Sequence, residues 1–183
     1  MSLTTTYQGI IGFFGRFRRA KKGATAVEFA LIATPFFFLL FAIVEITMVF
    51  FTSTALDQAS MEVARKVRTG EFQTEGASTS DFVDQVCAKM NSLIACNGNV
   101  SVDIRTFQDF GDVVVDDPID QDGNLDKGAF EFKPGDAGDI VLVRVFYSWK
   151  LNTPLIGNIF ANLSGNRRLI VSSLAFRNEP FGG

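Results

Sequence analysis

The sequence predicts an α+β protein in which one long N-terminal helix carries a small domain with a short helix and a mostly antiparallel sheet. Three features predict this fold. An apolar run extends from Val27 to Phe51, an amphipathic helical pattern continues it, and alternating apolar and polar residues follow from Val100 onward. A length of 183 residues allows one such helix and one domain with a single core.

A basic segment precedes the apolar run. Residues 1–23 contain five basic residues and no acidic one. The basic residues are Arg16, Arg18, Arg19, Lys21 and Lys22. Asp57 and Glu62 follow the run. Because segments rich in Lys and Arg remain on the cytoplasmic side of a membrane, we expect a cytoplasmic N-terminus and an exported C-terminal part.

The apolar run is long enough to cross a membrane. A helix over residues 27–51 is about 37 Å long, against about 30 Å for the hydrocarbon core of a bilayer. We therefore predict a single membrane span over about residues 27–51. Glu28, Pro35 and Glu45 interrupt it. An acidic residue at membrane depth is costly unless it is paired or near an interface, so both glutamates indicate function.

A stripe of apolar and small side chains extends the helical period beyond the membrane, and Gly70 is a typical helix stop. The stripe consists of Leu56, Ala59, Val63, Ala64 and Val67. The sequence thus predicts a basic leader over residues 1–23, a helix over 24–70 and an exported α+β head over 71–183.

Within the head, residues 70–80 read as a polar loop. A helix capped by Ser80 or Asp81 follows, with apolar residues that include Phe82, Val86, Met90, Leu93 and Ile94. Alternation predicts a half-buried strand over 100–105, in which Asp103 shares the polar face, and a central strand over 139–150. A short helix from Thr153-Pro154 to Gly165 and a last strand over 168–176 complete the prediction.

Cys87 and Cys96 both lie in the exported part. Two cysteines in an oxidising compartment predict one disulfide, and two buried thiols are the alternative. In one continuous helix these residues would face opposite sides, about 13 Å apart, which is too far for a bridge. The disulfide therefore requires the helix to end before Cys96.

Composition argues against several functions. Histidine is absent, so the usual general base and the commonest metal ligand are missing, and we expect no enzymatic activity. Beyond residue 23 the chain has 12 basic and 20 acidic residues, a balance that disfavours binding to nucleic acid.

Seven aspartates and no basic residue lie between Asp109 and Asp126. Four residues alternate in a way that resembles an oxygen-ligand calcium loop: Asp120, Asp122, Asn124 and Asp126. Leu125 stands where an EF-hand has glycine, and no closing glutamate follows. We expect a solvated acidic loop and no cofactor, with calcium as the alternative ligand.

The segment around Gly23 resembles a processing signal. Basic residues, Gly23, Ala24, three further small or apolar residues, Glu28 and Phe29 precede the apolar helix, as in type IV-like prepilins. The stretch from Lys21 to Glu45, together with the final RNEPF at 177–181, resembles the TadE-like minor pilin (pseudopilin) family of tight-adherence pili, which are type IVb-like.

The resemblance implies a pilin-like fold and cleavage after Gly23 by a prepilin peptidase, with Ala24 as the first mature residue. It implies that Glu28 pairs with the terminal amine of a neighbouring subunit. Because an unpaired charge among apolar helices is very costly, such a pair also sets the register of assembly. Pro35 is then either a tolerated membrane proline or a point of local unwinding. Glu45 either lies at the far interface or contacts a partner pilin.

The implied setting is a bacterial inner membrane, with the head periplasmic or extracellular and the mature chain entering a pilus. The implied partners are the prepilin peptidase, the major pilin, other minor pilins, the inner-membrane assembly platform and membrane lipid. The alternative is an uncleaved single-pass anchor whose exported head binds a ligand or a surface.

Overall fold

The computed structural model describes residues 23–90, 94–96, 98–153 and 157–182, apart from the side chain of residue 158. The basic residues before Gly23, as well as Leu93 and residues 154–156, lie outside this set. The described chain divides into two compact units, residues 1–43 and residues 44–183. The fold is α+β, with a long apolar N-terminal helix, short helices and a three-stranded antiparallel sheet, as predicted.

The long helix α2 covers Ala24–Arg68, close to the predicted 24–70. Short helices α3 (Glu71–Glu75) and α4 (Thr79–Lys89) follow, then strand β1 (Val100–Phe107). Two single turns, η2 (Phe110–Asp112) and η3 (Lys127–Ala129), lie in the connection to β2 (Ile140–Lys150). The one-turn helix α5 (Gly157–Phe160) and strand β3 (Arg167–Arg177) complete the fold.

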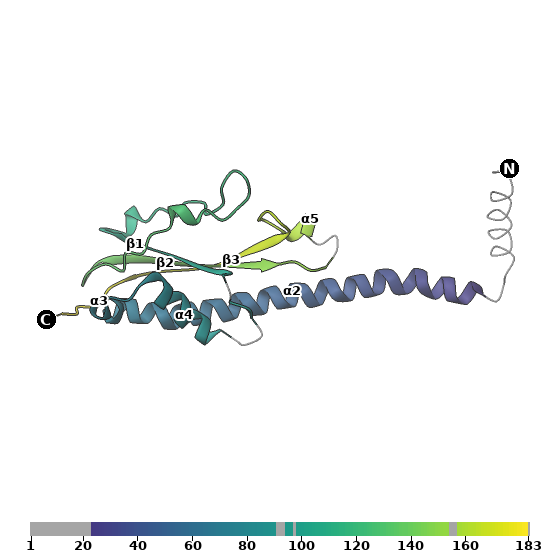
Figure 1. Ribbon diagram of the computed structural model, residues 1–183, viewed down its shortest axis with the longest axis horizontal. Helices are drawn as coiled ribbons and strands as arrows, with labels where there is room; N and C mark the ends of the chain where they lie inside the picture. The colour runs from purple at the N-terminus through teal and green to yellow at the C-terminus, as the bar shows by residue number, and fades with distance from the viewer. Residues whose placement is uncertain (1–22, 91–93, 97, 154–156, 183) are drawn as a thin grey trace, which may run out of the picture. The chain divides into compact units, whose positions relative to one another are not determined.

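The sheet has the order β1-β2-β3, so the apolar strand β2 is central, as its sequence predicts. The helices α2 and α4 cover one face of the sheet, and the long connection between β1 and β2 lies over the other (Figure 1). The main core lies between α2 and the sheet. Its fully buried members include Leu56, Val63 and Val67 of α2 and Val141, Val143 and Val145 of β2. Burying each such side chain contributes about 1.5–3 kcal/mol.

The region from Gly70 to Asp81 differs from the prediction of a loop. Helix α3 forms there because Phe72 is buried in the core and contacts Phe82, with ring centroids 5.6 Å apart. The cap of α4 is Ser78 and not Ser80 or Asp81. Asp81 instead closes a capping box, since its carboxylate accepts a hydrogen bond from the Ser78 backbone at 2.7 Å. The Ser78 hydroxyl and backbone N–H lower the pKa of Asp81.

Helix α4 ends at Lys89, and Cys87 and Cys96 form a disulfide with their Cα atoms 5.8 Å apart. Tyr147 of the central strand donates a hydrogen bond to the Ala95 carbonyl at 2.8 Å. The chain at Ala95 and Cys96 is thus tied both to the helix and to the sheet.

The predicted helix up to Gly165 is shorter than expected. In the described residues only α5 is helical, and Leu163 forms an isolated antiparallel bridge with Arg167. The apolar pattern around Leu163 therefore belongs to a tight turn before β3. This leucine fills a second small core with Phe146 and Leu169, on the sheet face opposite α2.

The tail over residues 177–181 caps the end of α2. The Glu179 backbone N–H donates to the Arg68 carbonyl at 2.8 Å, and the two side chains form an ion pair at 3.1 Å. Gly70 has φ +83°, and a Cβ atom built there would overlap the ring of Phe181. Helix carbonyls at a C-terminus lack partners within the helix, so the tail satisfies one of them.

Candidate membrane and assembly helix

The segment that resembles a processing signal lies at the start of α2. The helix begins at Ala24, and nothing lies within 4 Å of a Cβ atom built at Gly23. Gly23, Ala24 and Glu28 are all exposed, and Phe29 is 70% exposed. Glu28 follows Ala24 by one helical turn, so both residues lie on the same face about 6 Å apart along the axis. An amine created at Ala24 would therefore arise one turn away from a carboxylate.

If the chain were cut after Gly23, that carboxylate would also offset an electrostatic cost. A helix N-terminus carries a partial positive charge, so a new ammonium group there is unfavourable. The first turn of α2 contains no acidic residue, which leaves Glu28 as the first carboxylate along this helix. In an apolar surrounding the amine needs a carboxylate partner, supplied by its own chain or by a neighbour.

Beyond Glu28 the helix exposes apolar side chains all round. Large side chains between residues 27 and 43 are 38–71% exposed, among them Leu31, Ile32, Phe36 and Leu39. The described residues contain one helix long and apolar enough to cross a membrane, α2. Water does not tolerate a contiguous apolar surface of this kind, so lipid or partner helices must cover it. The helix indicates a membrane-anchored protein.

Helix α2 continues through Pro35 without a break. Thr34, Thr52 and Thr54 each donate a side-chain hydrogen bond to the carbonyl four residues earlier, at 2.8–3.1 Å. For Thr34, which lies in the exposed apolar part of the helix, this bond satisfies a hydroxyl group that lipid cannot. The sequence allowed two interpretations of Pro35, a tolerated membrane proline and a point of local unwinding. In this structure the helix is maintained at Pro35.

Glu45 makes its hydrogen bonds within the chain. Its two carboxylate oxygens accept the backbone N–H groups of Asn152, at 2.6 Å, and Thr153, at 2.7 Å. We call this arrangement the Glu45 clasp. The side chain is buried, and the clasp fixes the chain that leaves β2 against α2. Periodicity places Glu45 on a helix but cannot show that a loop more than 100 residues later returns to it.

The four residues of the calcium hypothesis do not converge. The Asp120 carboxylate accepts the backbone N–H groups of Asp122, at 2.9 Å, and Asn124, at 2.7 Å, and so builds a turn. Asn124 hydrogen-bonds Ser164, and Asp126 accepts the Gly128 N–H at 3.1 Å. In the described part of the chain no group of three or more Cys, Asp or Glu side chains is placed to hold a metal ion.

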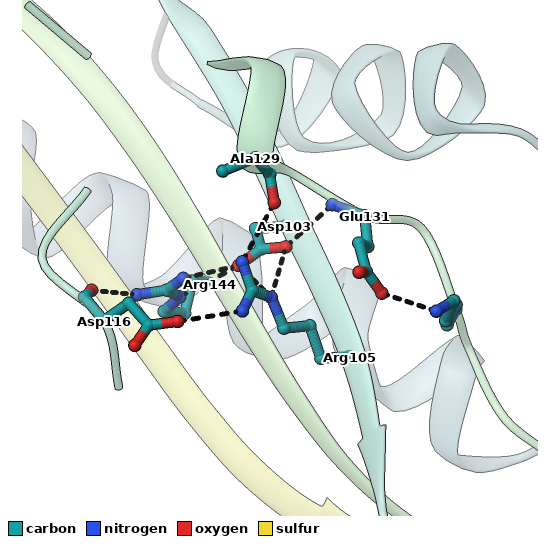
Figure 2. Close-up of polar contacts among 7 residues, drawn as sticks. Asp103, Arg105, Asp116, Ala129, Glu131 and Arg144 are labelled. Atoms are coloured by element: carbon teal, nitrogen blue, oxygen red, sulfur yellow. Dashed lines mark hydrogen bonds and ion pairs between the residues drawn. The ribbon is translucent and has the colours of Figure 1, made fainter. Parts of the chain in front are cut away.

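A buried ion-pair cluster was missed by the sequence reasoning. Asp103, assigned to a polar face, is 1% exposed and lies opposite Arg144 in the sheet register. Arg144 donates from Nε, at 3.1 Å, and from Nη2, at 2.6 Å, to Asp103 Oδ2 (Figure 2). The Arg105 Nε and the Glu131 backbone N–H donate to Oδ1 at 3.1 and 2.9 Å. The one sequence feature that could have indicated this cluster is Arg144, a lone arginine inside the apolar strand β2.

This cluster attaches the β1–β2 connection to the sheet. Arg144 donates to the Asp116 carbonyl at 2.7 Å, and Arg105 reaches the Asp116 carboxylate and the Ala129 carbonyl (Figure 2). Burial raises the pKa of Asp103, but the Glu131 N–H and the two guanidinium groups outweigh it, so the pKa lies below its usual value. Asp103 is therefore a charged, fully bonded group beneath an acidic loop.

Comparison with known proteins gives one match. Residues 23–65 match the family model described as TadE-like protein, which leaves most of the head outside the match. No curated protein and no solved structure matches the chain. The matched residues include Gly23, Glu28, Pro35 and Glu45. The match confirms the TadE-like resemblance of the N-terminal helix, and with the apolar helix it fits a minor pilin of a tight-adherence pilus.

Proposed function

We propose that the chain is a minor pilin, or pseudopilin, of a tight-adherence pilus of the type IVb-like class. A prepilin peptidase cleaves it after Gly23 on the cytoplasmic side of the inner membrane. The mature helix then enters a pilus or its initiation complex beside the major pilin and other minor pilins. The assembly platform of the inner membrane would act on it, and its role is structural rather than enzymatic.

One observation carries this proposal. Helix α2 begins at Ala24 and exposes apolar side chains on every side. Gly23, directly before it, has no atom within 4 Å of its Cβ position, and Glu28 follows Ala24 by one turn. A permanent anchor has no need of a carboxylate at that depth, where an unpaired charge costs several kcal/mol. A subunit that gains a new amine and then packs among neighbouring pilin helices does need one, because the pair neutralises both charges and fixes the axial offset.

The proposal is tested by the mass of the chain made with and without a prepilin peptidase. Co-expression in membranes should shorten the chain by residues 1–23 and leave Ala24 as the N-terminus. The variant Gly23→Leu should stay at full length. The matched control is Gly111→Leu, at another exposed glycine whose φ is not positive and whose Cβ position meets only an ordinary contact with Asp109, and it should be processed normally. A full-length wild-type chain in the presence of active peptidase would favour the uncleaved single-pass anchor.

The role of Glu28 is separable from cleavage. Glu28→Ala should be processed yet fail to co-purify with pili, and Glu28→Asp should recover part of the incorporation because it keeps the charge. Glu62→Ala is the control, since Glu62 lies on the same helix as Glu28, forms an exposed pair with Lys89 of α4, and has no assembly role assigned to it. Equal incorporation of Glu28→Ala and wild type would contradict the proposed charge pair.

A further inference from the structure

We propose that the Glu45 clasp marks the outer limit of the membrane span, and that the exposed side chains of Phe50 and Ile159 rest on the lipid interface of the exported side. The inference depends on the proposed insertion of α2 into a membrane. It depends neither on cleavage after Gly23 nor on entry into a pilus.

The clasp is too polar to lie inside the hydrocarbon core. If the span extended to Phe51, Glu45 would lie about 9 Å inside the hydrocarbon boundary, and the clasp would hold Asn152 and Thr153 at the same depth. Asn152 is exposed, and Lys150 two residues earlier is exposed as well. Irregular backbone exposed to lipid does not occur within the hydrocarbon region. The boundary must therefore lie at or before Glu45.

The part of α2 that precedes Glu45 is long enough to span a membrane. A helix over residues 24–44 is about 31 Å long, which matches a hydrocarbon core of about 30 Å. The compact unit that contains the sheet begins at Val44, so Glu45 belongs to that unit by its contacts. The span expected over residues 27–51 is thereby moved toward the N-terminus, and residues 45–51 become part of the head.

Exposed apolar side chains remain beyond the clasp. Phe50 is 69% exposed and Ile159, on α5, is 79% exposed. A cavity of about 240 Å³ lies between α2 and the start of β3, lined by Ile46, Phe50, Phe160, Arg168 and Val171 among others. The segment that carries Ile159 therefore lies beside the helix just past Glu45.

The chemistry of this surface fits the headgroup level of a bilayer. Aromatic and aliphatic side chains there accompany Arg168, whose guanidinium donates to the Phe160 carbonyl at 3.1 Å. A long cationic side chain among apolar ones is typical of an interface, where its stem packs on apolar groups and its head meets lipid phosphate. The acidic loop, in contrast, carries no basic residue between Asp109 and Asp126 and would be repelled by an anionic surface.

The test measures depth in the full chain. Single labels that report polarity are placed by Leu39→Cys, Ile159→Cys, Met61→Cys and Val114→Cys, because the native cysteines are held in a disulfide. The chain is reconstituted in vesicles of phosphatidylethanolamine and phosphatidylglycerol that contain lipids with nitroxide quenchers. We expect deep quenching at residue 39, shallow quenching at residue 159, and none at residues 61 and 114, where the native side chains are also exposed.

Two results would overturn the inference. A label at residue 159 as free of quenching as that at residue 114 would show that this surface does not meet lipid. Deep quenching at residue 61 would place the boundary far beyond Glu45. If a second copy of the chain covers Ile159, a pyrene label there should give excimers that depend on the ratio of protein to lipid, without lipid quenching, and this also contradicts the proposal.

The clasp itself is tested by Glu45→Ala in the chain labelled at residue 159. Loss of the clasp should remove the shallow quenching at 159 and leave the quenching at 39 unchanged. Glu62→Ala should alter neither. Unchanged quenching at 159 would refute the positioning role of Glu45. The mass of the same chain, made with and without the peptidase, reports cleavage after Gly23 independently, so failure of the pilin proposal is distinguished from failure of this one.

Discussion

Removing the carboxylate of Asp103 should destabilise the head more than any surface change. The side chain is fully buried and accepts four hydrogen bonds, two of them from Arg144. Asp103→Ala leaves the Arg144 guanidinium, 3% exposed, without its counter-charge. Breaking a buried pair by removing one partner costs about 3–5 kcal/mol. Urea unfolding of the full chain in detergent, followed by the fluorescence of the single tryptophan Trp149, measures the loss.

A double variant separates the worth of the pair from the cost of an orphaned charge. Asp103→Leu with Arg144→Met should recover much of the lost stability, because apolar groups of similar volume need no counter-charge. Asp116→Ala is the surface control. Its carboxylate reaches only Arg105 and is largely exposed, so we expect a loss of about 1 kcal/mol or less.

The pH dependence of stability has a defined sign at this site. The pKa of Asp103 is lower in the folded chain than in the unfolded chain, so its contribution is fully present above the unfolded value of about 3.9. The contribution is lost as the pH falls from there through the folded value. Asp103→Asn should flatten this acid limb of the stability curve. A cost below about 1 kcal/mol for Asp103→Ala, or an unchanged acid limb for Asp103→Asn, would refute the reasoning.

Three further predictions follow from the fold. Gly70→Ala should lower the free energy of unfolding by about 2–4 kcal/mol, because the φ of Gly70 is positive and the new methyl group would overlap Phe181. Gly76→Ala, also at positive φ but in open space, should lower it by about 1–2 kcal/mol. Equal losses in urea unfolding would contradict the contact between Gly70 and Phe181. Replacing Cys87 and Cys96 together by serine should lower the unfolding free energy by about 2–3 kcal/mol, and no loss would show that the short bridge is dispensable. Titration with calcium should give no heat and no rise in thermal stability, because the Asp120 carboxylate already holds its own turn, and saturable binding would show that the loop rearranges.

The sequence predicted the elements whose signals are local. The apolar run after Ala24 could only be a long exposed helix or a membrane span, and the alternation in the apolar strand over residues 139–150 identified the central strand. Gly70 was recognised as the end of the helix because a glycine directly after an amphipathic helical pattern is a typical helix stop. In each case the pattern of side chains along a short segment decides the structure, without reference to the rest of the chain.

The missed features all depend on contacts between distant segments. Asp103 alternates like a surface residue, and only its register opposite Arg144 and the connection above it explain its burial. Helix α3 forms because the core accepts Phe72. The Glu45 clasp joins residues more than 100 positions apart. Tertiary packing overrides local propensity at such positions, so a single sequence does not reveal them.

The central claim is that Glu28 belongs to a processed subunit, and the mature N-terminus tests it most directly. Intact-mass analysis of the chain purified from cells that contain a prepilin peptidase should show a polypeptide that begins at Ala24 and lacks all five basic residues of the leader. A chain that retains Arg16 to Lys22 under those conditions would contradict the account, because no new amine would exist for the carboxylate to neutralise.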